Sequence, residues 1–398
     1  MSIEHDDADG EIAEAERTSD VGTVDEGDAA DGVDRTGGGH GLGRRHSVRE
    51  GVELVGVGLV GALATAMLAF LAVDWLRDAP GAAGAFGTEL FRTALILGEW
   101  ADFYLDTNVF RHPFVWRAVA TGVLVGIVGP VVGSFLVHRQ MALIGETLAH
   151  TAFAGVAFGM LFIALGAGLA GGAVALFGSS GTLLIVALVV SAASALGLQW
   201  LTDRTDSYGD VPIAIVLTGS FAVGTLVISW SRGFVAIAID IEDFLFGSLA
   251  IVTATGARLV ALLTVVVVAL TVYNYKQFLF ITFDERAARV ARLDVERYNA
   301  LLIVMTATVV VGAMQILGVI LVAGLLVIPV AAASQVAKSF RETLYLSVLA
   351  GQVSVLGGLG VAIGVGLPPG GSIIVIAIAI YLFAVAVSDR STGSISVH

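Results

Sequence analysis

The sequence predicts an all-α, polytopic membrane protein of about eight to ten transmembrane helices, and three observations predict this fold class. Of its 398 residues, 57% are hydrophobic and only 14% are charged, which excludes an ordinary soluble domain. Several apolar runs reach the roughly 20 residues that a helix needs to cross the hydrocarbon core of a bilayer. Small residues also recur four apart within these runs, a spacing that lets membrane helices pack closely.

Ten apolar segments are candidate spans, and each is expected to form one helix. They cover residues 51–73, 114–137, 144–168, 181–202, 210–230, 252–274, 299–318, 320–337, 343–366 and 371–388. The stretch 299–337 fits either two helices joined by a tight turn or one broken helix, so the number of helices stays open.

Four regions are expected along the chain. Residues 1–49 are rich in Asp and Glu and poor in large apolar side chains, so they are predicted to form a disordered acidic cytoplasmic tail. Residues 50–113 are expected to supply an extra N-terminal transmembrane helix and an external loop that is amphipathic in places. Residues 114–388 form the main membrane domain, and 389–398 a cytoplasmic C-terminal tail.

The basic residues predict the orientation. Fifteen of the 21 Lys and Arg residues fall on the side of the N-terminal tail, whereas only Arg77, Arg92, Arg111 and Arg232 fall on the opposite side. Cytoplasmic loops carry the excess of positive charge in multi-pass proteins. Both termini are therefore expected in the cytoplasm, with the protein in the cell membrane.

Two explanations fit the net charge of −13 and the presence of only two lysines, Lys276 and Lys338. The composition is typical of a halophile, because high salt reduces the Debye length to about 3 Å at 1 M and weakens acidic repulsion. Alternatively, the acidic tail recruits a partner. The absence of cysteine excludes disulfides and thiolate metal sites.

Glu146 and His150 are the strongest candidates for a functional site. They are four residues apart, so on a helix they lie on the same face. Ionisable side chains inside a membrane cost free energy and usually mark an ion or substrate pathway. Carboxylate oxygens with a ring nitrogen suit a divalent transition metal. We therefore expect a metal pathway here, with a purely structural pair that locks two helices as the competing interpretation.

Small residues beside this pair predict a helix–helix contact. Thr147, Thr151, Gly155 and Gly159 are spaced four apart along the same segment. Since lipid gives no hydrophobic drive for helix association, such stripes let two backbones approach. The Glu146/His150 face is thus expected to be turned toward another helix.

Other polar residues allow weaker predictions. Asp240, Glu242 and Asp243 lie on the predicted external side, where they would form a cation-attracting mouth or simply an acidic surface. Three further polar residues fall within spans and are candidates for hydrogen bonds that lock helices together. They are Arg117, Arg258 and Gln315.

Five stretches of the chain follow the order of motifs in one known family. They are Gly133-Ser-Phe-Leu-Val-His-Arg-Gln-Met-Ala-Leu-Ile-Gly-Glu-Thr-Leu-Ala-His150, Leu245-Phe-Gly-Ser248, Phe283-Asp-Glu-Arg-Ala287, Gln315-Ile-Leu-Gly-Val-Ile-Leu-Val-Ala-Gly-Leu-Leu-Val-Ile-Pro-Val-Ala-Ala-Ala333 and Gly366-Leu-Pro-Pro-Gly-Gly-Ser-Ile-Ile-Val375. In these residues the chain resembles the permease subunits of zinc/manganese ABC importers, the ABC-3 family, over about residues 114–388.

The resemblance implies a function and a set of partners. The chain would be a homodimeric permease moving Zn²⁺ or Mn²⁺, with a cytoplasmic ABC ATPase, an external metal-binding protein and the membrane lipid, and without nucleic acid. It would not be an enzyme and would hold no permanent cofactor, since it lacks the Gly-rich phosphate loop of an ATPase. The residues implied in coupling to the ATPase are Phe283, Asp284, Glu285, Ala287, Ala291 and Leu293.

The chain departs from the family pattern at three positions. Glu146 replaces a usual Asp, which moves the carboxylate oxygens by one methylene. Arg292 replaces a usual Gly, so the coupling segment is expected to stay helical further. Gly366 replaces a frequent Asp.

Two alternative functions remain. One is an ion-coupled secondary transporter or channel for the same cations, which would need no ATPase; the lack of a visible internal repeat weighs against it. The other is an ABC permease for a metal chelate such as a siderophore or cobalamin, which would need a large cavity without Glu146 and His150 at its centre.

Overall fold

The computed structural model describes residues 40–164, 185–194, 196–197, 211–231, 245–247 and 252–392. The chain divides into two compact units, Met1–Arg49 and Glu50–His398, and the helices from residue 50 onward belong to the second. The predicted acidic tail falls mostly outside the described residues. Its last ten residues, 40–49, are helical and form the first turns of α1, which therefore begins before the predicted start of the first span.

All regular elements among the described residues are helices. They are α1 (His40–Leu76), α2 (Ala82–Leu105), α3 (Pro113–His138), α4 (Ala142–Ala164), α6 (Val211–Ser231), α8 (Ala254–Tyr273), α9 (Tyr275–Phe283), α10 (Glu285–Val290), α11 (Val295–Leu317), α12 (Val319–Ser334), α13 (Phe340–Val365) and α14 (Pro369–Thr392). Eight are long and apolar enough to cross a membrane, and the shorter helices Ile185–Ser194 and Val319–Ser334 are also apolar. The predicted fold class is confirmed.

The ambiguous stretch 299–337 forms two helices. The break is at Gly318, whose φ of 86° lies in the left-handed region that glycine adopts without strain. α11 ends at the residue before it and α12 begins at the residue after it. α12 is consequently short, with 16 residues.

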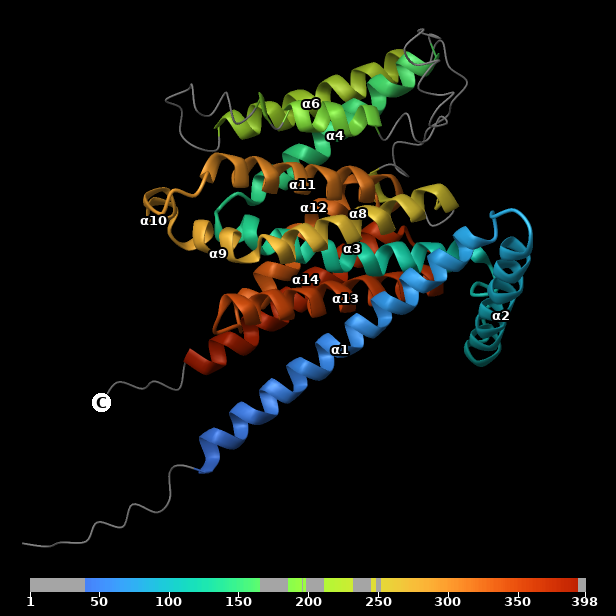
Figure 1. Cartoon of the computed structure of the whole chain (residues 1–398), viewed down its shortest axis with the longest axis horizontal. Helices are drawn as coiled ribbons and strands as arrows, with labels where there is room; N and C mark the ends of the chain where they lie inside the picture. Colours follow the sequence, from blue (N-terminus) through green and yellow to red (C-terminus); the bar gives the residue numbers. More distant parts are fainter. Residues whose placement is uncertain are drawn as a thin grey trace, which may run out of the picture. The chain divides into compact units, whose positions relative to one another are not determined.

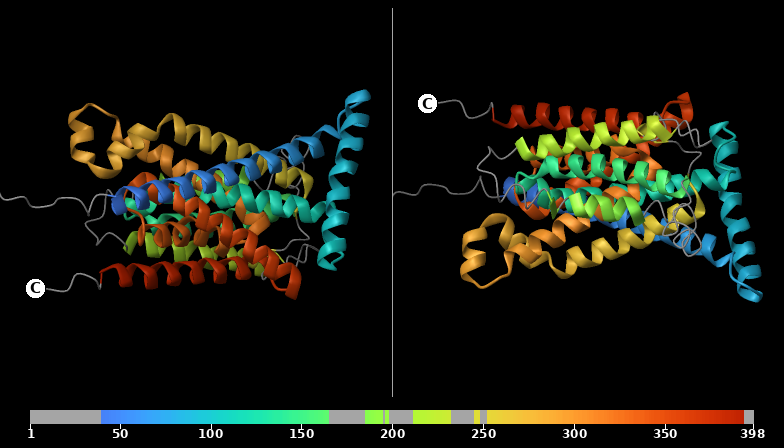
Figure 2. Two further views of the ribbon diagram at one scale, coloured as in Figure 1. Left: turned by 90° about the horizontal axis from the view of Figure 1, so that it is seen from below. Right: turned by 90° about the horizontal axis from the view of Figure 1, so that it is seen from above.

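The long helices run side by side, and the bundle has two distinct ends (Figures 1 and 2). One end carries α9, α10 and the C-terminal end of α14; we call it the α10 end. At the opposite end, called the α2 end, α2 lies crosswise to the long helices (Figure 2). The amphipathic part of the predicted external loop is thus a helix of 24 residues.

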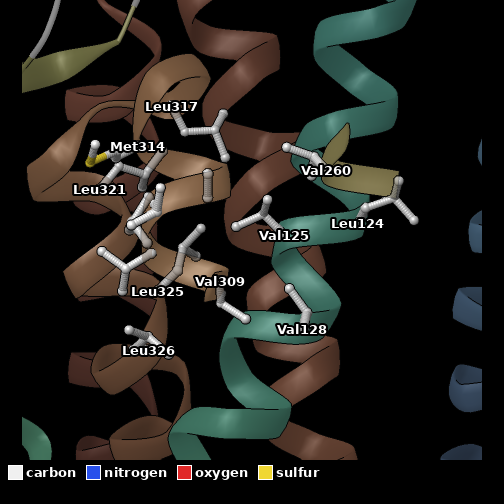
Figure 3. Packing of buried hydrophobic residues seen from close by; sticks show 14 of the residues in the cluster. Leu124, Val125, Val128, Val260, Val309, Met314, Leu317, Leu321, Leu325 and Leu326 are labelled. Atoms are coloured by element: carbon white, nitrogen blue, oxygen red, sulfur yellow. The ribbon is translucent and has the colours of Figure 1, made fainter. Parts of the chain in front are cut away.

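The core is built around α3, which is buried along most of its length. Figure 3 shows Val125 and Val128 of α3 facing Val309 of α11, with Leu325 of α12 beside it. Helix α12 comes closest: a Cβ atom added to Gly133 would collide with the backbone carbonyl oxygen of Leu326. Glycine at this position therefore sets the distance between α3 and α12.

A buried carboxylate joins α1 to the rest of the bundle. Asp74, which is 1% exposed, accepts hydrogen bonds from Arg117 of α3 through Nε at 2.9 Å and Nη2 at 2.8 Å. Arg258 of α8 donates from Nη2 to the backbone oxygen of Asp74 at 2.8 Å and pairs with Asp78 at 2.6 Å. Arg77 completes the network, 3.1 Å from Asp74. Arg117 and Arg258 lock helices as predicted; the side chain of Gln315 lies outside the described residues.

A second carboxylate shapes the connection from α2 to α3. Asp102 accepts a hydrogen bond from Thr107 Oγ1 at 2.8 Å and three from the backbone N–H groups of Val109, Phe110 and Arg111 at 2.8 to 2.9 Å. Burial acts to raise the pKa of Asp102, but these hydrogen bonds outweigh it and lower the pKa from 3.8 to about 2. The ionised carboxylate therefore holds the loop in place.

The loop after α2 is expected to loosen in acid. Because the pKa of Asp102 is lower in the folded protein, its stabilisation is present above pH 4 and is lost as pH falls from about 4 toward 2. Hydrogen exchange of the Val109–Arg111 amides, corrected for intrinsic rates, should lose protection over this range. Asp102→Asn should show low protection already at pH 6, whereas Asp106→Asn, which keeps the Asp102 carboxylate, should match the wild type. Equal protection at pH 6 and pH 2.5 would contradict the role of Asp102.

Candidate metal site between α4 and α12

Helix α4 begins directly after a tight turn. α3 ends at His138, and Gln140 takes a φ of 58°, so that Met141 donates its N–H to Leu136 at 2.8 Å and Gln140 donates to Val137 at 3.0 Å. This is the pattern of a helix end closed by a left-handed residue. Glu146 and His150 then lie in the first turns of α4, on the face that their spacing predicts.

A cavity of about 290 Å³ lies between α4 and α12. Its wall on the α4 side includes Leu143, Glu146 and His150, and its wall on the α12 side includes Ile320, Ala323 and Gly324. Both sets repeat every three or four residues, so one face of each helix forms the cavity. The small residues of α12 leave the space into which the polar side chains of α4 open.

The two polar residues have different surroundings. Glu146 is exposed, whereas His150 is half-buried and its ring meets Phe221 of α6 edge-on at 5.2 Å between centroids. The Nδ1 atom of His150 is buried and has no hydrogen-bond partner among the residues that the structure describes. A buried polar atom without a partner costs free energy, which a bound cation would recover.

The small-residue stripe of α4 makes the expected helix contact. A Cβ atom on Gly155 would lie 2.9 Å from the Cα atom of Ala187, and Thr151 Oγ1 lies 3.5 Å from Ser191 Oγ. Thr147 and Thr151 also return hydrogen bonds to backbone oxygens of their own helix. This face packs on the helix at 185–194, while the neighbouring Glu146 side is left open to the cavity.

One copy of the chain offers few metal ligands at this point. Among the described residues, no group of three or more His, Asp or Glu side chains converges on one position. Glu146 and His150 are the ionisable groups of the cavity wall, and zinc usually takes four ligands. The set is therefore incomplete within a single described chain.

The predicted coupling segment forms two short helices at the α10 end. Asp284 begins α10 and accepts a hydrogen bond from Ala287 N at 2.8 Å, and Glu285 pairs with Arg289 at 2.7 Å. Phe283 is 64% exposed, and Ala291 is also exposed. Leu293 instead packs inward beside Ile281, Ala288 and Val295. The segment thus presents part of its predicted apolar surface outward.

The expectation that Arg292 prolongs the helix is wrong. α10 ends at Val290, and Arg292 takes a φ of 60°, the left-handed conformation that glycine fills most easily. The N–H of Leu293 then bonds the carbonyl of Ala288 at 3.1 Å, which closes the helix end. The backbone at position 292 thus keeps the left-handed conformation that suits glycine, although the residue is an arginine. Gly366, with a φ of 75°, ends α13 in the same conformation.

Three of the motif stretches meet at one point, which sequence spacing alone did not reveal. Added Cβ atoms on Gly247 and Gly318 would fall 2.5 to 3.0 Å from each other's backbone, and one on Gly370 would collide with the carbonyl oxygen of Phe246. The Leu245–Gly247 element therefore packs on the α11–α12 break and on the start of α14. Asp240, Glu242 and Asp243 lie outside the described residues.

Comparison with known proteins decides the family. The model of the ABC 3 transport family matches residues 111–388. The chain belongs to this family. The matched range contains the α4–α12 cavity and the α9–α10 segment, and it leaves out α1 and α2.

Named relatives of this family member include manganese and zinc transport proteins. It is 29% identical over 277 residues to the manganese transport system membrane protein MntC of Listeria monocytogenes, covering 70% of this chain and 91% of MntC. It is 23% identical over 245 residues to the high-affinity zinc uptake system membrane protein ZnuB of Haemophilus influenzae, covering 62% and 86%. The PsaBC complex from Streptococcus pneumoniae superimposes with a TM-score of 0.59 and 26% identity, covering 69% and 91%.

Proposed function

We propose that this chain is the membrane permease of an ATP-driven importer for divalent metal ions, Zn²⁺ or Mn²⁺. The observation that carries the proposal is the α4–α12 cavity with Glu146 and His150 in its wall, within the part that matches the ABC 3 transport family. The names of the manganese and zinc relatives agree with it. Transport proceeds by alternating access, with ATP hydrolysis in a separate cytoplasmic subunit and metal delivered by an external binding protein.

Two copies of the permease complete the ligand set. Glu146 and His150 from each of two protomers would supply carboxylate oxygens and imidazole nitrogens in a number that suits tetrahedral Zn²⁺, or Mn²⁺ with added water. The exposure of Glu146 and the lack of a third ligand residue in the described part of one chain support this arrangement. Binding must also stay weak enough for release, so transient occupancy is expected.

The rival functions explain less of the structure. An ion-coupled secondary carrier gives no reason for the family match over residues 111–388. A permease for a metal chelate needs a large cavity without the Glu/His pair, but the cavity here measures about 290 Å³ and includes both side chains. A metal-chelate type ABC transporter in an inward-facing conformation superimposes with a TM-score of 0.52 at 15% identity, which supports a shared fold alone.

Orientation follows from charge. Lys276, Arg286, Arg289, Lys338 and Arg341 lie on the helices and turns at the α10 end. By the positive-inside rule we propose that this end, with both termini, lies in the cytoplasm. The α10 end is then where an ATPase docks, and the α2 end faces the exterior.

Reconstituted transport tests this function. Proteoliposomes that hold the chain with its candidate ATPase and binding protein should take up ⁶⁵Zn or ⁵⁴Mn only when ATP is present on the side of the membrane that carries the ATPase. The isotope that is taken up faster identifies the metal. Uptake that persists without the ATPase would favour the secondary carrier.

Ala291→Glu is expected to uncouple ATP hydrolysis from transport. Ala291 is exposed at the end of α10, so a carboxylate there would project into the ATPase contact and oppose the negative end of the helix dipole. Metal moved per ATP hydrolysed should fall, and the ATPase should be retained less well in a pulldown. Unchanged ATPase binding would contradict docking at this surface.

A further inference from the structure

Arg139 occupies the turn between α3 and α4, seven residues before Glu146. Its side chain is only 8% exposed. Nη2 donates a hydrogen bond to Oδ1 of Asn299 in α11 at 2.7 Å and lies 3.9 Å from Oε2 of Glu285 in α10. One buried guanidinium thus bridges the start of the metal-site helix and the segment expected to contact the ATPase.

The turn itself is closed by hydrogen bonds. The left-handed Gln140 and the two hydrogen bonds that close the end of α3 leave no free residue between Arg139 and the first turn of α4. The N–H of Ile144 also bonds the carbonyl of Met141 at 3.1 Å. A displacement of Arg139 therefore moves the beginning of α4.

The contact surface around Arg139 is packed on its α9 side by aromatic rings. Phe135 of α3 meets Phe278 of α9 at 5.6 Å and Phe340 of α13 at 5.2 Å. His138 meets Phe340 at 4.9 Å, and Phe283 meets Phe340 at 5.7 Å. α9 is thus packed against the end of α3 by aromatic contacts, whereas α10 approaches the turn through the carboxylate of Glu285.

We propose that Arg139 is a positioning residue that passes movement of α10 to α4, and so to Glu146 and His150. The proposal rests on the transport function given above. Glu285 holds the guanidinium from the ATPase side, Asn299 holds it against α11, and the closed turn carries the displacement into the metal-site helix. Arg139 touches no metal; it acts through the helix that it begins.

Substitution of either partner should lower coupling while the ATPase stays bound. Arg139→Gln and Glu285→Gln are expected to reduce metal transported per ATP hydrolysed by about 2- to 30-fold, the range for residues along a coupling route. Glu285→Gln serves as the second variant because the Glu285 side chain is 43% exposed, so its substitution should leave the protein folded. Arg297→Gln is the matched control, because its side chain is 86% exposed and pairs with nearby Asp294. It should transport as the wild type does.

The exchanged pair separates a charge link from a structural role. Arg139→Glu combined with Glu285→Arg restores opposite charges across the gap and should regain part of the coupling that each single variant loses. Wild-type coupling in Arg139→Gln would overturn the proposal. An exchanged pair that couples no better than the single variants would overturn it as well.

A reporter on α4 measures the link without transport. The chain has no cysteine, so Leu143→Cys gives one labelling site in the first turn of α4 for a bimane fluorophore. Mg-ATP added to the complex with the ATPase should change its emission, and the change should shrink in Arg139→Gln but persist in Arg297→Gln. Equal changes in both would contradict the link. A wild-type complex that moves neither Zn²⁺ nor Mn²⁺ would instead refute the transport function. The change in fluorescence would still test whether Arg139 links α10 to α4.

Discussion

His150→Ala and Glu146→Gln are each expected to abolish ATP-dependent metal uptake in proteoliposomes while the protein inserts normally. Both side chains line the α4–α12 cavity, and few other ligands are available within one described chain. Even the loss of a group that only hydrogen-bonds a metal ligand costs about 10- to 100-fold in affinity, so loss of a direct ligand should reduce uptake by at least about 100-fold.

The comparison with controls makes this result specific. Glu99→Gln removes an exposed carboxylate from α2, outside the cavity, and should leave uptake of ⁶⁵Zn and ⁵⁴Mn unchanged. Glu146→Asp restores a shorter carboxylate and should retain uptake with an altered ratio of the two isotopes, because the oxygens move by one methylene. Wild-type uptake by His150→Ala or Glu146→Gln would refute the metal pathway.

Asp74→Asn is expected to destabilise the protein by about 3 kcal/mol, the lower part of the range for breaking a buried ion pair. The carboxylate is 1% exposed, whereas Arg117 and Arg258 are 19% and 25% exposed, so water offsets some of the loss. The change removes the anionic partner of Arg117 at the junction of α1, α3 and α8, whereas Arg258 keeps its ion pair with Asp78 and its hydrogen bond to the backbone oxygen of residue 74. Thermal unfolding in detergent should show a clearly lower midpoint.

Asp78→Asn provides the matched control for this effect. Asp78 pairs with the same Arg258 at 2.6 Å, but its side chain is 64% exposed, so its loss should cost no more than about 1 kcal/mol. A double-mutant cycle of Asp74→Asn with Arg117→Gln should give a coupling energy well above zero. An unfolding midpoint equal to that of the wild type in Asp74→Asn would contradict the structural role of the network.

Local features could be predicted well from the sequence, whereas the contacts between distant segments could not. Helical periodicity placed Glu146 and His150 on one face, and apolar length placed the spans, because both depend on residues near in the chain. Nothing local indicated that Ile320 and Ala323 would form the opposite wall, or that Asp74 would be the partner of Arg117, since these contacts join distant segments.

Local rules also failed where tertiary packing overrode them. Arginine is a good helix former, so Arg292 was expected to extend α10, yet the surrounding chain holds it in a left-handed turn. Leu293, next to it, is partly buried and packs against the cluster of Ile281 and Val295, and the chain turns at Arg292 just before this contact. The left-handed backbone conformation of Arg292 therefore goes with the packing of Leu293 and not with the helix propensity of arginine.

The close approach of α3 and α12 at Gly133 fixes one side of the short helix α12. Backbone lies against backbone there, so neither water nor an ion fits between the two helices at the level of Gly133. Other residues of α12, among them Ala323 and Gly324, border the cavity. If metal passes through this cavity as proposed, a sideways shift of this short helix would widen or narrow the route, while its contact with α3 at Gly133 stays closed.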